Sequence, residues 1–345
     1  MEKLVESEDF VRSALKQFPK EPLLLCELSN NLQGQFEFEE AEKYARQVLD
    51  ISPNCGAAMV TLAIVLIHTG SEEEVLEIYK KALKEMPNEM SVSFNYALTL
   101  FCYGHLEEAW KRYRLRWETE SFTSPVRSFP QDQWDGSPLK GKSIILYGEQ
   151  GLGDEIRHAS MVPDMLKMGA EVYVECEPRL VDIFQRSFEG ANVFPYPYTE
   201  AETGKVDIDF QSAILDLGGY LRPTIDSFPS DPNHSFLKPD PERIVFWKER
   251  MEALGPQPKV GMIWQSTKAA GGRGRWGATV EELAPILSIK GIDFVNLMYV
   301  ECNEDRAKML ELYGVNLHTW DDIDLRNDQD DLCALISNLD LVISH

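Results

Sequence analysis

The stretch SIILYGEQGLGDEIRHASMVPDMLKM, residues 143–168, contains a complete strand, loop and helix pattern. Residues 143–147 form an apolar run of strand length, residues 148–153 form a glycine-rich loop, and residues 154–168 have helical spacing. A second apolar run, EVYVEC, follows at residues 171–176. This order predicts a βαβ unit, and therefore a parallel sheet covered by helices.

Further along the chain, apolar runs again alternate with helical patterns. The sequence predicts strands at residues 259–264, 292–298, 314–318 and 339–343. It predicts helices near residues 279–289, 303–313 and 328–337. Residues 118–140 lack any period and read as a linker. We therefore expect a second α/β region that begins near residue 259.

Upstream of the first strand, several sets of similar residues recur every 34 residues. The clearest sets are Pro19, Pro53 and Pro87, then Ala41, Val75 and Ala109, then Ala45, Tyr79 and Tyr113. This period resembles the tetratricopeptide-repeat family, with small residues where two helices cross and a proline closing the second helix. Residues 22–53, 56–87 and 90–117 fit helix pairs, and residues 5–18 fit the second helix of an earlier, partial repeat.

Arrays of this kind usually offer a concave surface to a partner, but they also pack against a neighbouring domain, and the sequence leaves both roles open. The nuclear and cytoplasmic O-GlcNAc transferases carry a ladder of asparagines in this groove. The aligned positions here hold Glu27, Thr61 and Asn95, so no such ladder is present. The threading of a peptide along that ladder is therefore not carried over to this chain.

The composition restricts the class of protein. The chain has 345 residues, is 43% hydrophobic and carries a formal net charge of −23, which argues against nucleic acid or an anionic membrane as partner. No apolar run approaches the ~20 residues of a membrane span, and the acidic N-terminus lacks the pattern of a signal peptide. We therefore expect a cytoplasmic protein. The six cysteines form no CxxC pair and the histidines no HExxH motif, so we expect no disulfide, metal or other cofactor.

Two glycine patterns near the first strand resemble nucleotide-binding motifs. Residues 136–143, GSPLKGKS, satisfy the GxxxxGK[ST] pattern, but that loop must open a helix, whereas this one contains Pro138 and leads into a strand. Gly148, Gly151 and Gly153 do not have the spacing of a dinucleotide-binding fingerprint. An ATP loop and a dehydrogenase are therefore both disfavoured.

The block WDGSPLKGKSIILYGEQGLGDEIRHASMVPDML, residues 134–166, resembles proteins in which tetratricopeptide repeats precede a heptosyltransferase-like glycosyltransferase. Further matches are ECEPRLVDIFQRSF (175–188), LGGYLRP (217–223), KVGMIWQS (259–266) and DLVIS (340–344). The chain departs from the family at Arg157-His158 and at Met298-Tyr299. The resemblance implies a GT-B fold. Its parts would be a repeat array (1–120), a linker (121–140), a Rossmann-like acceptor half (141–240), a hinge helix and linker (241–258), and an incomplete Rossmann-like donor half (259–345).

Inverting sugar transfer needs a base for the proton of the acceptor hydroxyl. In the family this base is the aspartate of the G-x-G-D block, and Asp154 is the matching position. The other interpretation of Asp154 is a helix N-cap, worth roughly 1 kcal/mol, and the two roles are compatible. Gly151 and Gly153 let substrate approach the backbone, or merely permit a tight turn. Glu155 is expected to be a favourable charge in the first helical turn.

A donor site is predicted in a positive segment of this acidic chain. Residues 253–280 contain four bases, including Lys259, and no acid. The loop after the strand 259–264 carries Gln265, Ser266, Lys268, Arg273 and Arg275, which suit a diphosphate, although a solvated surface loop has the same composition. The resemblance adds Ser344 and His345, because in the family this last strand leads to a helix whose N-terminus meets the donor diphosphate.

These patterns predict an inverting glycosyltransferase that moves a sugar from a nucleotide-diphospho-sugar to a hydroxyl of a glycan or protein, with the array groove as a possible acceptor surface. The alternative is a non-catalytic interaction protein with a relic transferase domain. Because the family's donor-site helix would follow His345, we expect these 345 residues alone to bind donor poorly and not to turn over. The strand at residues 339–343 is then expected to leave apolar surface exposed.

Overall fold

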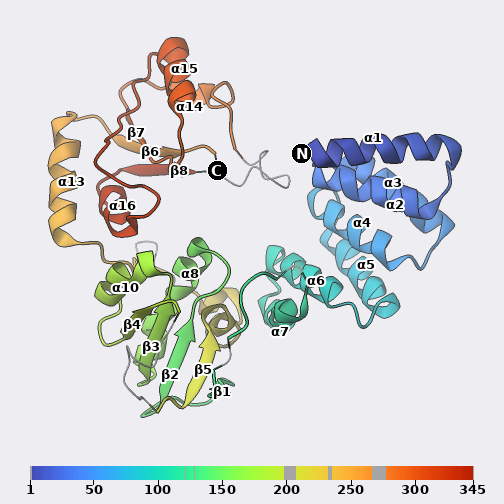
Figure 1. Ribbon diagram of the computed structural model, residues 1–345, viewed down its shortest axis with the longest axis horizontal. Coiled ribbons are helices and arrows are strands. Elements are labelled where there is room, and N and C mark those ends of the chain that lie inside the picture. The colour runs from blue at the N-terminus through green and yellow to red at the C-terminus, as the bar shows by residue number, and fades with distance from the viewer. Residues whose placement is uncertain are drawn as a thin grey trace. The chain divides into compact units, whose positions relative to one another are not determined.

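The structure is a computed structural model that describes residues 2–120, 122–127, 129–197, 207–231, 235–265 and 277–344, without the side chains of residues 2–5. It divides into two compact units. One comprises residues 1–128 and 215–232, and the other comprises residues 129–214 and 233–345. Figure 1 shows helices alone in the N-terminal region and parallel sheets with helices in the other unit. The expected fold class, a helical array followed by an α/β region with parallel sheets, is confirmed.

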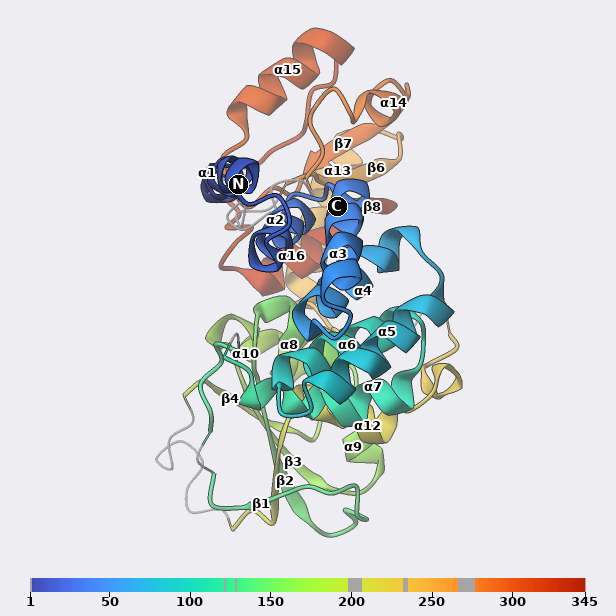
Figure 2. The same ribbon diagram turned by 90° about the vertical axis from the view of Figure 1, so that its right-hand side faces the viewer.

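The first unit is an array of antiparallel helices, seen in Figure 2 as successive stacked layers. They are α1 (Glu2–Gln17), α2 (Pro22–Gly34), α3 (Phe38–Ile51), α4 (Gly56–Thr69), α5 (Glu72–Glu85), α6 (Met90–Cys102) and α7 (Leu106–Tyr113), followed by the 3₁₀ turn η1 (Arg114–Glu118). The small repeat residues Ala41, Val75 and Ala109 are fully buried, and the rings of Tyr79 and Tyr96 stack at 5.0 Å. The predicted helix pairs are therefore confirmed.

The first unit also contains a segment from far along the chain. Residues 215–232 cluster with the array, although the sequence assigns them to the acceptor half. They contain most of η3 (Ile214–Leu217), then α12 (Gly218–Leu221) and η4 (Ile225–Ser227). The difference arises because this segment packs against α7 and η1, which end more than 90 residues earlier.

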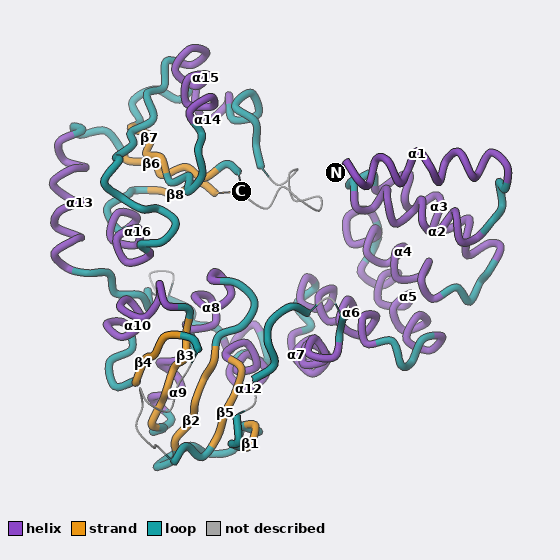
Figure 3. Tube along the Cα trace, in the orientation of Figure 1, coloured by secondary structure: helices purple, strands orange, loops and turns teal. Residues whose placement is uncertain are grey.

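The second unit holds a five-stranded parallel sheet in the order β1-β5-β2-β3-β4 (Figure 3). Its strands are β1 (Asp132–Gln133), β2 (Ser143–Tyr147), β3 (Glu171–Cys176), β4 (Asn192–Pro195) and β5 (Phe210–Ala213). The βαβ prediction is confirmed, since β2 and β3 pair in parallel with Ser143 opposite Glu171. Part of the expected linker belongs to the sheet, because β1 pairs with β5 and the adjoining Trp134 is buried.

The helix predicted at residues 154–168 is two helices. They are α8 (Leu152–Ala159) and α9 (Val162–Lys167). Pro163 has no backbone N–H, so in one continuous helix it could not donate a hydrogen bond to the Ala159 carbonyl oxygen. At the start of α9, where it lies, a helix needs no such donor. After β3, η2 (Pro178–Leu180) and α10 (Val181–Ser187) cover the sheet.

The same unit contains a three-stranded parallel sheet in the order β7-β6-β8. Its elements are α13 (Pro241–Ala253), β6 (Lys259–Ile263), α14 (Ala284–Leu287), β7 (Asp293–Asn296), α15 (Asn303–Tyr313), α16 (Gln329–Ile336) and β8 (Leu341–Ser344). The helix expected at residues 279–289 shortens to α14, which begins beside Pro285. The strand expected at residues 314–318 is a single bridge between Val295 and His318.

Three smaller expectations also concern this structure. Leu341 and Val342 on β8 are 55% and 38% exposed, as predicted for that strand. The six cysteines are free thiols, of which Cys176 is buried and Cys102 is exposed. None of the helices in the part of the chain that the structure describes has the length and apolar character needed to span a bilayer.

Candidate functional site

The loop after β2 lies where doubly wound sheets bind ligands. The chain runs from β2 outward through β3 and β4, and then crosses back to place β5 on the other side of β2. The carboxyl ends of β2 and β5 therefore flank a topological switch point, the usual position of the ligand crevice in such sheets. The loop Gly148–Gly151 and the start of α8 follow β2 at this point.

Asp154 sits in the first turn of α8. Its Oδ2 accepts a hydrogen bond from the Gly151 backbone N–H at 3.2 Å, and its Oδ1 accepts one from Arg157 Nη2 at 3.0 Å. The N-cap residue is Gly151, so Asp154 caps the helix from its third position and is not the N-cap residue itself. The Asp154 side chain is 34% exposed and therefore accessible to solvent.

Two of the residues that depart from the family pattern, Arg157 and His158, contact Asp154. Arg157 pairs with its carboxylate, and the His158 Nδ1 lies 2.9 Å from its backbone carbonyl oxygen. The Arg157 side chain is 69% exposed. An ion pair of that kind contributes only about 0.2–1 kcal/mol, so another group can displace Arg157 at small cost.

Three glutamates near this loop are buried: Glu149, Glu155 and Glu175. Glu155 lies in the first turn of α8 as predicted, but its Oε2 accepts the backbone N–H of Glu177, beyond the end of β3, at 2.9 Å. Burial, together with the carboxylates of Glu155, Glu177 and Glu175, raises the pKa of the Cys176 thiol. Sequence reasoning missed this acidic cluster because Glu175 is a single acidic residue in an otherwise apolar strand and belongs to no recognisable motif.

The glycines of the loop have different roles. A Cβ on Gly148 would lie 2.3 Å from Glu155 Cδ, so no other residue fits there without displacing the buried carboxylate. A Cβ on Gly151 would lie 3.5 Å from Asp154 Oδ2, an ordinary contact, and one on Gly153 would meet nothing within 4 Å. The left-handed residue of the turn is Gln150, with φ 64°. The turn therefore does not require glycine at positions 151 and 153, and their role in letting substrate approach stays a prediction.

Gly153→Ala is expected to raise the free energy of unfolding by up to about 1 kcal/mol, because alanine is the better helix former and has room here. It should weaken binding of a nucleotide-sugar measured by calorimetric titration, because the new methyl occupies the approach to the backbone. Gly148→Ala is the matched comparison and should instead lower stability by about 1–3 kcal/mol through overpacking. Unchanged binding in Gly153→Ala would contradict the role of Gly153.

The carboxyl end of β6 carries the donor-side candidates that the structure describes. The Asp305 Oδ2 accepts hydrogen bonds from Trp264 Nε1 at 2.8 Å and from the exposed Gln265 Nε2 at 3.3 Å. Ser344 on β8 pairs with Ile263, so the register brings Ser344 next to the end of β6. Sequence reasoning missed Asp305, which lies 40 residues beyond Gln265 and has no motif. Ser266, Lys268, Arg273, Arg275 and His345 lie outside the described residues.

Lys259 does not belong to an anion site. It is buried at the amino end of β6, where its Nζ lies 2.9 Å from Asp293 Oδ2 and 2.7 Å from the Gly255 carbonyl oxygen. Its charge is therefore neutralised within the fold. The predicted positive segment loses one of its four bases for this reason.

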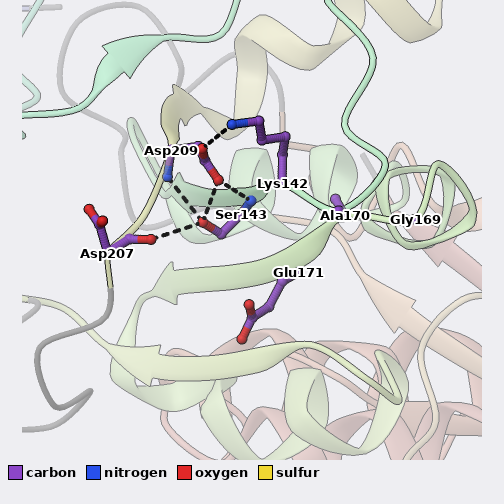
Figure 4. Close-up of a pocket in the computed structure, with 8 residues that line it drawn as sticks. Lys142, Ser143, Gly169, Ala170, Glu171, Asp207 and Asp209 are labelled. Atoms are coloured by element: carbon purple, nitrogen blue, oxygen red, sulfur yellow. Dashed lines mark hydrogen bonds and ion pairs between the residues drawn. The ribbon is translucent and has the colours of Figure 1, made fainter.

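An open pocket of about 540 Å³ lies at the opposite, amino ends of β2 and β3 (Figure 4). The Asp209 carboxylate accepts Lys142 Nζ at 2.6 Å and the Ser143 backbone N–H at 2.9 Å, and the bond from Lys142 lowers the pKa of Asp209. Lys142 and Ser143 are the last residues of the GxxxxGK[ST] pattern, and Ser143 begins β2 rather than a helix. This geometry ties β5 to β2 and does not form a phosphate loop.

Within the described ranges, no group of three or more His, Cys, Asp or Glu side chains has an arrangement that could hold a metal ion. The buried glutamates therefore do not form a carboxylate metal site there. The expected absence of a cofactor stays a prediction.

One comparison with known proteins concerns the array and two extend over nearly the whole chain. Residues 32–91 match the model of the tetratricopeptide repeat. FlbA from Caulobacter vibrioides is 31% identical over an alignment that covers 98% of this chain and 59% of FlbA. A mutant O-GlcNAc transferase from Thermobaculum terrenum aligns over 98% of this chain and 74% of its own, with 15% identity and a TM-score of 0.33. This chain thus spans somewhat more than half the length of FlbA, and residues 32–91, within the 34-residue period, match the tetratricopeptide repeat.

Proposed function

We propose that the second unit belongs to an inverting glycosyltransferase that uses a nucleotide-diphospho-sugar. The observation that carries the proposal is the position of Asp154. Its partly exposed carboxylate stands at the carboxyl end of β2, at the switch point of the five-stranded sheet, beside the open face of Gly153. A base for an acceptor hydroxyl needs this combination of access and fixed orientation.

In the proposed reaction the acceptor oxygen attacks the anomeric carbon of the sugar. A new carbon–oxygen bond forms while the bond from that carbon to the diphosphate oxygen breaks, so the configuration inverts. The acceptor proton passes to the Asp154 carboxylate, and the electron pair of the broken bond leaves on the nucleoside diphosphate. Arg157 is displaced from Asp154 when the hydroxyl binds, which costs little for so exposed a pair.

The donor diphosphate is assigned to the loop after β6. Gln265 and Ser344 lie at the carboxyl ends of neighbouring strands, and Asp305 orients Gln265. Lys268, Arg273 and Arg275 would supply the positive charge that stabilises the leaving group. The acceptor is a hydroxyl of a glycan or protein, and the array is a candidate surface for holding it.

A non-catalytic interaction protein remains the second candidate, and one observation favours it. Both oxygens of Asp154 already have partners, Gly151 and Arg157, as expected of a carboxylate with a purely structural role. Calorimetric titration with UDP, GDP, ADP and CDP separates the two, because a relic domain has no reason to retain a nucleotide preference. Saturable binding of one nucleoside diphosphate supports the enzyme. Because these 345 residues alone are expected to bind donor poorly, binding of none at low salt supports the interaction protein only if a longer homologous protein also binds none.

The double variant Arg273→Ala/Arg275→Ala tests the donor loop. We expect it to weaken binding of the preferred nucleoside diphosphate by tenfold or more, since two charge-assisted contacts are lost. The melting temperature should stay nearly unchanged. Lys290→Ala, an exposed base outside the loop, controls for the loss of one positive charge and is compared with each single arginine variant. Unchanged binding of the double variant at low salt, where screening is least, would remove these arginines from the site.

A further inference from the structure

The motif LGGYLRP, residues 217–223, has no part in the proposed reaction. The strand β5 ends at Ala213, and η3 and α12 follow it without an intervening loop. Residues 215–232 then cluster with the helical array, and Figure 2 shows α12 beside α7. The motif therefore lies on the last helix of the repeats.

The contact with Trp110 of α7 is close and specific. A Cβ on Gly218 would lie 2.2 Å from Cζ2 of the Trp110 ring, so the backbone of α12 rests directly on the indole. The Trp110 Nε1 donates a hydrogen bond to the Arg222 carbonyl oxygen at 2.9 Å. At the next residue, Gly219, an added Cβ would lie 3.5 Å from the Trp110 Cβ, which is an ordinary van der Waals contact.

Charged side chains of η1 complete the contact. Arg116 is fully buried and its Nη1 donates to Asp216 Oδ1 at 2.8 Å. The Arg114 guanidinium lies 4.7 Å from the centre of the Tyr220 ring. Through these contacts the segment 216–222 covers both α7 and η1.

Repeat arrays need such a cover at their ends. Each repeat buries its apolar face against the next one, so the last helix must be covered by something other than a repeat. After η1 no further helix is present in the described residues up to β1. We propose that residues 215–222 are the cap of the tetratricopeptide array, in the place where a further repeat would pack.

The cap has a consequence for the local unfolding of the end of the array. Its first residues continue directly from β5, the strand that borders the switch point of the five-stranded sheet. The end of the array and residues 214–222 therefore open and close as one cooperative unit.

Hydrogen exchange of the full chain, followed by mass spectrometry, tests the cap. Gly218→Ala should accelerate exchange by about tenfold or more both in α6–α7 and in residues 214–222, and leave α2–α3 near the wild-type rate. Gly219→Ala is the matched control and should change neither region. Trp110→Leu combined with Gly218→Ala should recover part of the protection, because the smaller side chain makes room for the new methyl.

If Gly218→Ala does not fold, a double-mutant cycle with Arg114→Ala and Tyr220→Ala gives a milder form of the same test, because Arg114 is exposed and Tyr220 is half-buried. Wild-type exchange in α6–α7 of Gly218→Ala would overturn the cap. An equal effect of Gly219→Ala would overturn it as well, because the contact with Trp110 would then not be the cause. The measurement needs no substrate, so it is independent of the proposed reaction.

Discussion

Replacing Asp216 by Asn should lower the free energy of unfolding of the first unit by about 3–5 kcal/mol, because it removes one partner of a buried ion pair. Arg116 has no exposed surface, and its Nη1 lies 2.8 Å from Asp216 Oδ1. The guanidinium also lies over the rings of Tyr113 and Trp117, at 4.8 and 5.0 Å. Those rings attract the cation but do not replace the negative charge that balances it.

Chemical denaturation followed by far-ultraviolet circular dichroism measures this loss. Asp226→Asn, an exposed aspartate of the same segment, removes the same charge without a buried partner and should change stability by less than about 0.5 kcal/mol. Arg116→Met combined with Asp216→Leu should be far less damaging than Asp216→Asn alone, because no charge is then left buried. Equal stability of Asp216→Asn and Asp226→Asn would show that Arg116 finds another partner.

Replacing Asp154 by Asn should reduce kcat by about 100-fold or more while leaving donor affinity unchanged, because the amide cannot accept the acceptor proton. Asn keeps an oxygen that can accept the Gly151 backbone N–H, now made by Asp154 Oδ2, so the cap of α8 is preserved. The turnover measurement belongs in a longer homologous protein that carries this aspartate, because this chain spans only 59% of the length of FlbA. Donor affinity is measured on the same protein by calorimetric titration.

Two further variants separate catalysis from structure at this position. Asp182→Asn changes an exposed aspartate in the first turn of α10 and should leave kcat unchanged. Arg157→Ala breaks the exposed ion pair to Asp154 and should leave most of the turnover intact. A parallel loss of donor binding and melting temperature in Asp154→Asn would identify Asp154 as a structural residue.

Much of the fold follows from local sequence patterns. The 34-residue period predicts the helices of the array, since each repeat must bury the same small residues against its neighbour, and Ala41, Val75 and Ala109 are indeed buried. Apolar runs of strand length predict β2, β3, β6 and β7, because strands buried on both faces are apolar along their length. The position of Asp154 at the start of a helix after β2 was predictable in the same way.

Contacts between distant segments were decided only by the tertiary structure. The sequence around β1 has no period, yet Trp134 is buried there because β5 lies alongside β1. The donor-side pair of Gln265 and Asp305 and the clustering of the buried glutamates also arise from strands that meet at one edge of a sheet.

The repeats follow from local sequence patterns, whereas their cap depends on contacts between distant segments. By itself the sequence determined that the N-terminal part is a helical array and that a parallel α/β region follows, because periodicity and strand-length runs are properties of neighbouring residues. Only the tertiary structure decided that Gly218 rests on Trp110 and that Asp216 neutralises Arg116. The partners in each pair are about 100 residues apart in the sequence. Whether a glycine approaches an indole closely, or an arginine is buried, depends on which distant surfaces meet. A local sequence period contains no information about that.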